Sequence, residues 1–283
     1  SENTGEGKLA RLFLKKLIKK EQYHIVFNQK KKLKNKYLPT LLGILYCWKK
    51  FFMNEKVCYL NYLPLWNFLI FIFLPPKTIL GPITGGANYS NSNILSYLTR
   101  RFFFPLFYKI SEFALNFRKS KLIFSTDLLK RYLLKKTIQK SNFNFVIKNF
   151  YLKKKSFKKK KIDFLLYYRK HKNKETFFPY DFIKRLIKLK FKIYVVGSKL
   201  NLPLVNNCGY ISNNKILNLQ SQSKYTIMSG ENPYSFFILE CLSNRVKVIV
   251  KKNMIKKFIF SKKNFIELNF NSLNDIKKIK KIR

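Results

Sequence analysis

The chain has 283 residues, which is enough for two domains that each bury a core of their own. Hydrophobic residues make up 47% of it, so the composition is that of a globular protein and not of a disordered one. Lysine and arginine number 59 against 13 aspartates and glutamates, which gives a net charge of +46. Two explanations of this charge stay open: a polyanionic partner, or a codon bias toward Lys, Ile, Asn, Phe and Tyr. Charge alone therefore assigns no partner.

The cysteines and the N-terminus indicate a reducing cytoplasm. No CxxC pair or metal-ligand spacing is present, and the chain has only two histidines, so a zinc site is not expected. The four cysteines are far apart: Cys47, Cys58, Cys208 and Cys241. Buried free thiols are the default for such residues. The N-terminus is polar and has no signal-peptide pattern.

In the first half, short strand-like runs alternate with helical patterns. Strands are expected at residues 23–28, 57–61, 78–81 and 122–125, and helices at 9–20, 39–52, 64–74 and 93–117. Gly5 and Gly7 form a loop that opens directly into the first helix, so the first strand of this domain is missing from the pattern.

The most apolar stretch of the chain is residues 63–74. A helix of about 20 residues is needed to span a bilayer, so this stretch is too short to do so. Two interpretations stay open: a buried helix, and an interfacial anchor on a membrane surface.

The second half gives a clearer pattern. Strands are expected at residues 162–168, 191–196, 225–228, 246–250 and 265–268, and a helix at 179–190. One stripe of that helix is apolar: Phe182, Ile183, Leu186, Ile187 and Leu189. Strands that are each followed by a helix predict a parallel sheet covered on both faces. We therefore expect two Rossmann-like domains, at residues 1–145 and 146–283, with a lysine-rich stretch at their boundary that is either a solvated linker or a nucleic-acid arm.

In doubly wound sheets, ligands bind beyond the carboxyl ends of the strands. After the expected strand at 78–81, Gly81, Gly85 and Gly86 form either a tight turn or a close backbone approach to a ligand. Arg169 and Lys174 follow the strand at 162–168. The guanidinium of the arginine can donate two parallel hydrogen bonds to a diphosphate, and the lysine adds a compact positive charge. The alternative is a chance cluster in a basic chain.

A third segment, residues 229–240, reads as strand end, loop and buried helix. Glu231 stands in the loop, and the loop opens a helix whose N–H groups attract anions. Glu240 lies further along that helix and faces inward. A carboxylate there accepts two hydrogen bonds, as from a ribose, or is an ordinary helix-face carboxylate.

Taken together, these segments resemble the retaining GT-B glycosyltransferases of family four over most of the chain. Such enzymes carry an Arg and a Lys after the first strand of the C-terminal domain, then a strand that ends in Val-Val-Gly, then a Glu-x7-Glu segment. This sequence has the same landmarks in the same order: Arg169 and Lys174, Val195-Val-Gly197, a loop around Gly209, and Glu231 with Glu240. Eight residues, in place of seven, separate the two glutamates.

The resemblance implies a GT-B fold, in which the parallel sheets of two Rossmann-like domains face each other across a cleft. It implies a hexosyl transfer from a nucleotide-diphosphate sugar to a glycan or lipid-linked acceptor, with retention and without a metal or other cofactor. Residues 1–145 would be the acceptor side, and residues 146–283 would bind the nucleotide sugar.

The resemblance also assigns roles to individual residues. Glu231 is the catalytic residue that contacts the transferred sugar, and Glu240 binds the ribose. The donor diphosphate is bound by five residues: Arg169, Lys174, Tyr234, Ser235 and Phe236. The N-terminal side of the cleft is lined by four glycines: Gly5, Gly7, Gly85 and Gly86.

The expected setting is polysaccharide biosynthesis in the cytoplasm. The basic surface and the apolar stretch at 63–74 suit attachment to the anionic inner face of the cytoplasmic membrane. No nucleic-acid partner is expected, because no RNP-like, zinc-finger or helix-turn-helix signature is present. The alternatives are a basic protein that binds nucleic acid or acidic membranes, and a catalytically inactive GT-B relative.

Overall fold

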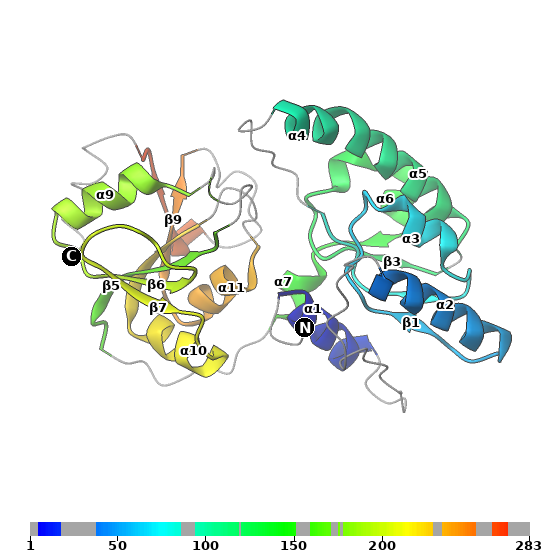
Figure 1. Cartoon of the computed structure of the whole chain (residues 1–283), viewed down its shortest axis with the longest axis horizontal. Helices are drawn as coiled ribbons and strands as arrows, with labels where there is room; N and C mark the ends of the chain where they lie inside the picture. Colours follow the sequence, from blue (N-terminus) through cyan, green and yellow to red (C-terminus); the bar gives the residue numbers. More distant parts are fainter. Residues whose placement is uncertain are drawn as a thin grey trace. The chain divides into compact units, whose positions relative to one another are not determined.

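The computed structural model describes residues 5–17, 38–85, 94–118, 120–150, 159–170, 175, 178–228, 234–252 and 262–270. The strand expected at residues 23–28 lies outside these ranges. The chain forms two compact units (Figure 1). Unit 1 is Ser1–Ala87 with Asn93–Phe150, and unit 2 is Asn88–Ser92 with Tyr151–Arg283. The acceptor-side and donor-side roles expected for the two halves stay predictions.

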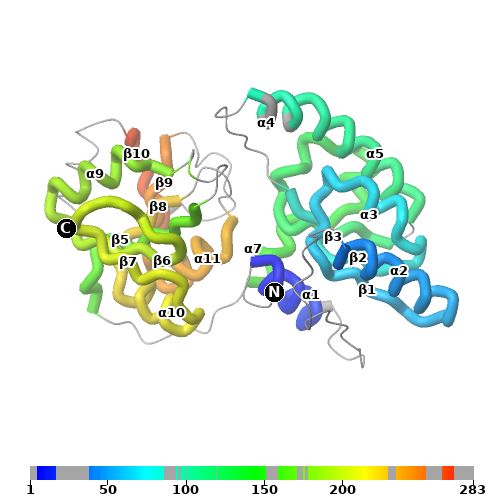
Figure 2. Tube along the Cα trace, viewed as in Figure 1, coloured from blue at the N-terminus to red at the C-terminus, as the bar shows by residue number. Residues whose placement is uncertain are grey.

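Unit 2 contains a six-stranded sheet in which all neighbouring strands are parallel. The strands are β5 (Ile162–Tyr168), β6 (Ile193–Gly197), β7 (Val205–Gly209), β8 (Ser223–Ile227), β9 (Lys247–Lys251) and β10 (Phe265–Leu268). Their spatial order is β10-β9-β8-β5-β6-β7 (Figure 2). Counted from β5, this is the order 3-2-1-4-5-6 read from the other side, which is that of doubly wound dinucleotide-binding folds. The order reverses between β5 and β8.

Helices cover both faces of this sheet (Figure 1). On one face, α9 (Tyr180–Lys188) shares a core cluster with β5, β6 and Ile249 of β9. On the other face, α11 (Phe236–Ser243) packs its Ile238 against Val248 and Val250. Successive residues of a strand point to opposite faces, so the two clusters lie on opposite sides of β9. The helix α10 (Asn213–Ser221) packs beside α11.

The central strand β5 forms because its residues are apolar on both faces, as in buried parallel strands. Phe164, Leu166 and Tyr168 pack against the buried stripe of α9, and Leu165 is buried on the opposite face. The bounds predicted for β5 and β10 are confirmed, and so is the buried stripe of α9 at Phe182, Ile183, Leu186 and Ile187.

Asp163 is a carboxylate buried near the amino end of β5. One of its oxygens accepts a hydrogen bond from the backbone N–H of Lys192, at 2.9 Å, and the other lies 3.2 Å from Nζ of Lys224. Lys192 precedes β6 and Lys224 lies in β8. This single carboxylate therefore ties the central strand to both of its neighbours.

Unit 1 is built on short parallel strands. They are β1 (Cys58–Tyr59), β2 (Ile79–Leu80), β3 (Leu122–Ile123) and β4 (Ser141–Asn142). β1 pairs with β2 and β3 pairs with β4, all in parallel. A parallel bridge between Ile83 and Phe124 joins the two ladders. Both units are thus α/β with parallel strands.

Helices α2 (Leu38–Phe52), α3 (Phe68–Phe73) and α5 (Phe104–Asn116) share one core cluster with these strands. α5 continues from α4 (Ile94–Leu98) through a π-helix, η1 (Thr99–Phe103). Pro105 lacks the N–H that an α-helix needs at that point, which accounts for the widened turn before it. No described helix is long and apolar enough to cross a membrane.

The remaining helical segments are short, apart from α1. α1 (Gly5–Leu17) packs against α7 (Phe145–Asn149), with the rings of Phe13 and Phe145 5.7 Å apart. The short helices η2 (Lys130–Tyr132) and α6 (Lys135–Gln139) lie between β3 and β4 in the chain, and η4 (Lys262–Asn264) precedes β10 in unit 2.

Buried cations in unit 1 are paired with backbone carbonyls. The guanidinium of Arg118, which is only 4% exposed, donates to the carbonyls of Phe71, Leu74 and Pro75 at the end of α3, at 2.8–3.1 Å. Nζ of Lys140 donates to carbonyls at the end of α5. Burial lowers the pKa of both groups. Each cation thus donates to carbonyls at or just beyond the end of a helix, the region where a helix leaves its own carbonyls without N–H partners.

Two expectations for unit 1 were wrong. Gly5 and Gly7 were expected in a loop, but both lie in the first turn of α1. Glu6 in the same turn complements the positive end of the helix, which favours starting the helix there. The helix expected at 64–74 begins only at Phe68, because Leu63 and Leu65 exchange backbone hydrogen bonds with Thr84.

β7 and α10 were not predicted from the sequence. β7 reads Val-Asn-Asn-Cys-Gly and has no alternation of buried and exposed residues that would mark a strand. α10 is largely polar and is capped by Ser212, whose side chain accepts a hydrogen bond from the N–H of Lys215. Both elements are held by pairing and packing with neighbours that are distant in sequence.

Gly197 ends β6 with φ +104°, and a Cβ there would overlap the carbonyl oxygen of Tyr168. We expect Gly197→Ala to lower the free energy of unfolding by about 3 kcal/mol, since left-handed strain and backbone overlap combine. Gly209→Ala is the matched control: φ is +68°, and no described atom lies within 4 Å of its Cβ. It should cost about 1 kcal/mol from strain alone. Urea denaturation measures both, and equal losses would contradict this account of Gly197.

Candidate functional site

The candidate site lies at the carboxyl edge of the sheet in unit 2, where the strand order reverses. Ligands of doubly wound sheets bind outside the carboxyl ends of the strands at this point. β5 ends at Tyr168 and is followed directly by Arg169 and Lys170, both exposed. β8 ends at Ile227, and the chain re-enters the described part at Tyr234, just before α11.

The end of β5 and the first turn of α11 are in contact. The rings of Tyr167 and Phe237 have centroids 5.6 Å apart and are inclined by 32°. Burial raises the pKa of the Tyr167 phenol, and the positive charge of Arg169 opposes this shift. Arg169 lies two residues beyond Tyr167, at the end of the strand whose ring contacts α11.

The N-terminus of α11 is well formed. Ser235 has extended backbone angles, φ −63° and ψ 147°, and its Oγ accepts a hydrogen bond from the N–H of Ile238 at 3.4 Å. This is the geometry of an N-cap, which leaves the positive end of the helix directed at the loop. Tyr234 before it is buried. A helix end of this kind attracts anions.

A second group of hydroxyls lies at the same edge. The backbone N–H of Lys170 donates to Oγ of Ser198 at 2.9 Å, and that Oγ lies 2.9 Å from the hydroxyl of Tyr210. Ser198 follows β6 and Tyr210 follows β7. Sequence reasoning missed Ser198, although a hydroxyl residue directly after the Val-Val-Gly strand was a usable signal. These contacts fix the chain that leaves β5.

Tyr168 anchors the loop beyond Arg169. Its hydroxyl donates to the carboxylate of Glu175 at 2.8 Å and lies 2.7 Å from the hydroxyl of Tyr180. Burial raises the pKa of Tyr168, and its hydrogen bonds with Tyr180 and Glu175 raise it further. Lys174, which directly precedes Glu175, lies outside the described residues, and so does Glu231. Their assigned roles stay predictions.

Glu240 is buried on α11 and is only 4% exposed. One of its carboxylate oxygens lies 3.5 Å from Nε2 of Gln220 on α10. Gln220 in turn accepts a hydrogen bond from Asn244, at 3.1 Å. These contacts join α10 to α11. The assignment of Glu240 to a ribose stays a prediction, and it requires that one of the two oxygens be reached from the crevice.

The glycines expected to line the N-terminal side of a cleft belong to unit 1, and that role stays a prediction. A Cβ on Gly85 would lie 2.5 Å from Cδ1 of Leu129, so the absence of a side chain allows that leucine to pack there. Gly86 lies outside the described residues. Glu6 of α1 lines a hollow of about 10 Å³ beside the loops after β1 and β2, which is room for about one water.

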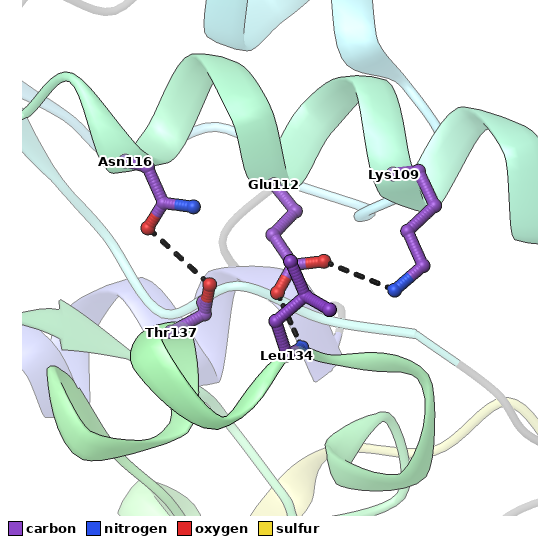
Figure 3. Close-up of polar contacts among 5 residues, drawn as sticks. All are labelled: Lys109, Glu112, Asn116, Leu134 and Thr137. Carbon is purple, nitrogen blue, oxygen red and sulfur yellow. Dashed lines mark hydrogen bonds and ion pairs between the residues drawn. The ribbon is translucent and has the colours of Figure 1, made fainter.

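Unit 1 also contains a buried carboxylate, Glu112 on α5 (Figure 3). One oxygen accepts a hydrogen bond from the backbone N–H of Leu134 at 2.6 Å, and the other lies 3.5 Å from Nζ of Lys109. Nearby, the hydroxyl of Thr137 donates to Asn116 at 3.3 Å. Both oxygens of Glu112 are thus engaged where α6 starts. These contacts indicate a structural carboxylate that joins α5 to α6.

Within the part of the chain that the structure describes, no three His, Cys, Asp or Glu side chains are grouped as metal ligands would be. Both histidines lie outside it. The four cysteines are described, and all are free thiols. Burial raises the pKa of Cys47 to about 11 and that of Cys58 to about 12, so neither is an activated nucleophile.

The chain is similar to solved structures but matches no family model or curated sequence. A crystal structure of a glycosyltransferase from Rickettsia africae ESF-5 is similar to it, with a TM-score of 0.48 and 16% sequence identity. The likeness covers 95% of this chain and 77% of that chain. A likeness at this level establishes neither the fold nor an activity.

The contact between Tyr167 and Phe237 can be measured by a double-mutant cycle. Replacing each ring by alanine, singly and together, should give a coupling free energy of about 0.5–1.5 kcal/mol, the usual range for aromatic pairs. Urea denaturation of the four proteins measures it. Tyr167→Ala combined with Leu204→Ala is the control, because Leu204 lies before β7 at the amino edge of the sheet. That pair should be additive within about 0.5 kcal/mol. If the losses in stability caused by Tyr167→Ala and Phe237→Ala were additive, the two rings would not be coupled, and the contact between β5 and α11 would be contradicted.

Proposed function

We propose that this protein is a glycosyltransferase that moves a sugar from a nucleotide-diphosphate sugar to a glycan or lipid-linked acceptor. One observation carries the proposal. At the point where a doubly wound parallel sheet reverses its order, an exposed arginine directly follows β5, and the first turn of the capped helix α11 contacts the same strand through the Tyr167–Phe237 pair. Both features favour a diphosphate. The sequence landmarks that resemble family-four glycosyltransferases fall at the same loops.

In this proposal the protein acts mainly on the leaving group. Cleavage of the bond between the sugar and the diphosphate builds negative charge on the departing phosphate oxygens. Arg169, Lys174 and the backbone at Tyr234–Phe236 stabilise that charge, since cationic side chains and the N–H groups of a helix N-terminus attract anions. Glu231 contacts the transferred sugar, and Glu240 binds the ribose.

The finer features of the proposal follow the sequence resemblance. Transfer occurs with retention and without a metal ion, since cationic side chains and the helix N-terminus neutralise the diphosphate. The two units adopt the GT-B arrangement, with the acceptor on the side of Gly5, Gly7, Gly85 and Gly86. The enzyme is of the hexosyltransferase type, works in polysaccharide biosynthesis and associates with an anionic membrane surface.

The test is turnover of a panel of UDP- and GDP-sugars, followed by release of the nucleoside diphosphate. We expect one nucleotide class to be used, with full activity in EDTA. Arg169→Asn should lower kcat/KM at least tenfold, since hydrogen bonds to charged groups contribute about 1.5–3 kcal/mol. A calorimetric titration with UDP and GDP should show the same loss in affinity.

Arg245→Asn is the matched control for Arg169→Asn. It removes the same charge from an exposed residue that precedes β9, at the amino edge of the sheet. Its φ of 55° is one that asparagine adopts readily. Its kcat/KM should equal that of the parent protein. If both variants lost kcat/KM equally, the loss would be due to the change in net charge and not to the position of Arg169. Absence of nucleotide binding and of turnover would overturn the proposal.

A further inference from the structure

Exposed apolar side chains are concentrated in unit 1. Of the 21 large apolar side chains exposed among the described residues, 18 belong to unit 1 and three to unit 2. Scattered exposed apolar residues are normal on a soluble protein, but a contiguous group of them indicates an interaction surface. Most of these side chains in unit 1 lie on three helices, α2, α3 and α5, or directly beside them.

On α2 the exposed side is largely apolar, and Lys49 is the exposed charged residue on it. Leu41, Leu42, Leu45 and Phe52 are exposed, and their spacing places them on one stripe. The opposite side, with Ile44 and Cys47, is buried in the core of unit 1. The stripe that faces outward on a surface helix is normally polar. α2 is therefore largely apolar on both sides.

α3 and α5 repeat this arrangement. On α3 the three exposed side chains are Leu69, Ile72 and Phe73, while Ile70 and Phe71 are buried. On η1 and α5 the exposed stripe contains Phe102, Leu106, Phe113 and Phe117. Residues 63–74 were expected to be either a buried helix or an interfacial anchor. α3 buries one side in the core and exposes the other, and the interfacial anchor stays a prediction.

The three helices lie side by side. The indole N–H of Trp48 on α2 donates to the carbonyl of Phe73 at the end of α3, at 2.7 Å. α3 and α5 pack together through Phe68 and Phe107, whose ring centroids are 5.2 Å apart. Figure 2 shows α3 between α2 and α5. Their exposed stripes form the α2–α3–α5 face, which consists of Leu41, Leu42, Leu45, Phe52, Leu69, Ile72, Phe73, Phe102, Leu106, Phe113 and Phe117.

The charge that accompanies this face is positive. Lys49, Lys77, Arg101 and Lys109 are exposed on or beside the same helices. Among the described residues of α2, α3, η1 and α5 the sole carboxylate is Glu112, which is buried. The face therefore combines apolar side chains with cations and offers no exposed carboxylate on these helices. Its partner has to be both apolar and anionic.

A hollow of about 280 Å³ opens at one end of this face. Phe52, Glu55, Lys56 and Lys77 line it, and the carboxylate of Glu55 is paired with Nζ of Lys50 at 2.6 Å. The ammonium groups of Lys56 and Lys77 supply positive charge that suits a phosphate group. An anionic headgroup at the end of an apolar face is the arrangement found at a lipid surface.

We propose that the α2–α3–α5 face docks on an anionic lipid bilayer. A second copy of this chain is a poor partner, because a symmetric contact would bring two cationic faces together. A nucleic acid supplies phosphates but no layer that would take up leucine, isoleucine and phenylalanine side chains. A bilayer supplies both, since apolar side chains enter the interface while lysines remain at the headgroups. The inference extends the membrane association in the proposed function, but its test requires no glycosyl transfer.

The test is flotation of the purified full chain with vesicles of phosphatidylcholine, with and without phosphatidylglycerol. The test variant carries Leu45→Glu, Leu69→Glu and Phe113→Glu, one substitution on each helix. A second variant carries serine at the same three positions, so that loss of apolar area is separated from added charge. The matched control is Leu204→Glu, because Leu204 is 82% exposed and lies in unit 2. Thermal melts verify that each variant is folded.

We expect binding to the phosphatidylglycerol vesicles and little binding to phosphatidylcholine alone. The serine variant should lose at least tenfold in apparent affinity and the glutamate variant more, while Leu204→Glu should bind like the parent. Part of the binding should persist at 0.5 M salt, because insertion of apolar side chains is not screened. Affinity for UDP or GDP should be unchanged in all variants, which separates this test from that of the proposed function.

Three outcomes would overturn the inference. Equal binding by the parent and by the folded serine variant would mean that the charge of the whole surface drives adsorption. Complete loss of binding at 0.5 M salt would lead to the same conclusion. Failure to bind either vesicle, with a dimer in solution that the serine variant abolishes, would make the face a contact between two copies of the chain.

Discussion

The pairing of β5 with β6 on one side and with β8 on the other is the constraint on which the candidate site depends. Because every strand of this sheet is parallel, all carboxyl ends open at one edge. The chain proceeds from β5 to β6 and β7 and then returns to β8, so the strand order reverses between β5 and β8, which is where doubly wound sheets bind their ligands. The buried carboxylate of Asp163 ties these three strands together at the opposite edge.

The scarcity of acidic residues shapes the rest of the molecule. Of the nine acidic residues that the structure describes, Asp163, Glu112 and Glu240 are buried and engaged in contacts between elements. Buried cations such as Arg118 are accordingly paired with carbonyl oxygens at a helix end. With 59 lysines and arginines against 13 carboxylates, the cations far outnumber the acidic side chains that could pair with them. A positive potential at the crevice and along the helices of unit 1 follows from this distribution, whether codon bias or selection produced it.

The fold could be predicted where apolar pattern and local signals agreed. β5 is buried on both faces and α9 carries a clear apolar stripe, so the sequence alone located both. β7 and α10 were missed because their residues are polar and their positions depend on β6 and α11. Gly5 and Gly7 were misassigned because glycine suggests a loop, although a first helical turn tolerates it. The structure of β7 and α10 depends on contacts with residues distant in sequence, and a local sequence pattern does not contain that information.

The site was predictable in its location more than in its detail. The loops after β5 and β8 follow from the rule for parallel sheets, so Arg169 and Ser235 were named in advance. Ser198 was missed because its importance comes from two contacts, with Lys170 and with Tyr210, which join three separate loops. The exposed side of α3 was equally hidden, since an apolar sequence does not reveal which of its residues face water.

The most direct test of the central claim, that the carboxyl edge between β5 and β8 binds a nucleoside diphosphate, is amide hydrogen exchange with and without UDP or GDP. The account predicts that one of the two slows exchange in peptides that cover residues 167–170 and 234–238, and leaves the amino ends of the strands unchanged. Slowed exchange confined to unit 1 or to the amino edge, with none at the crevice, would contradict it.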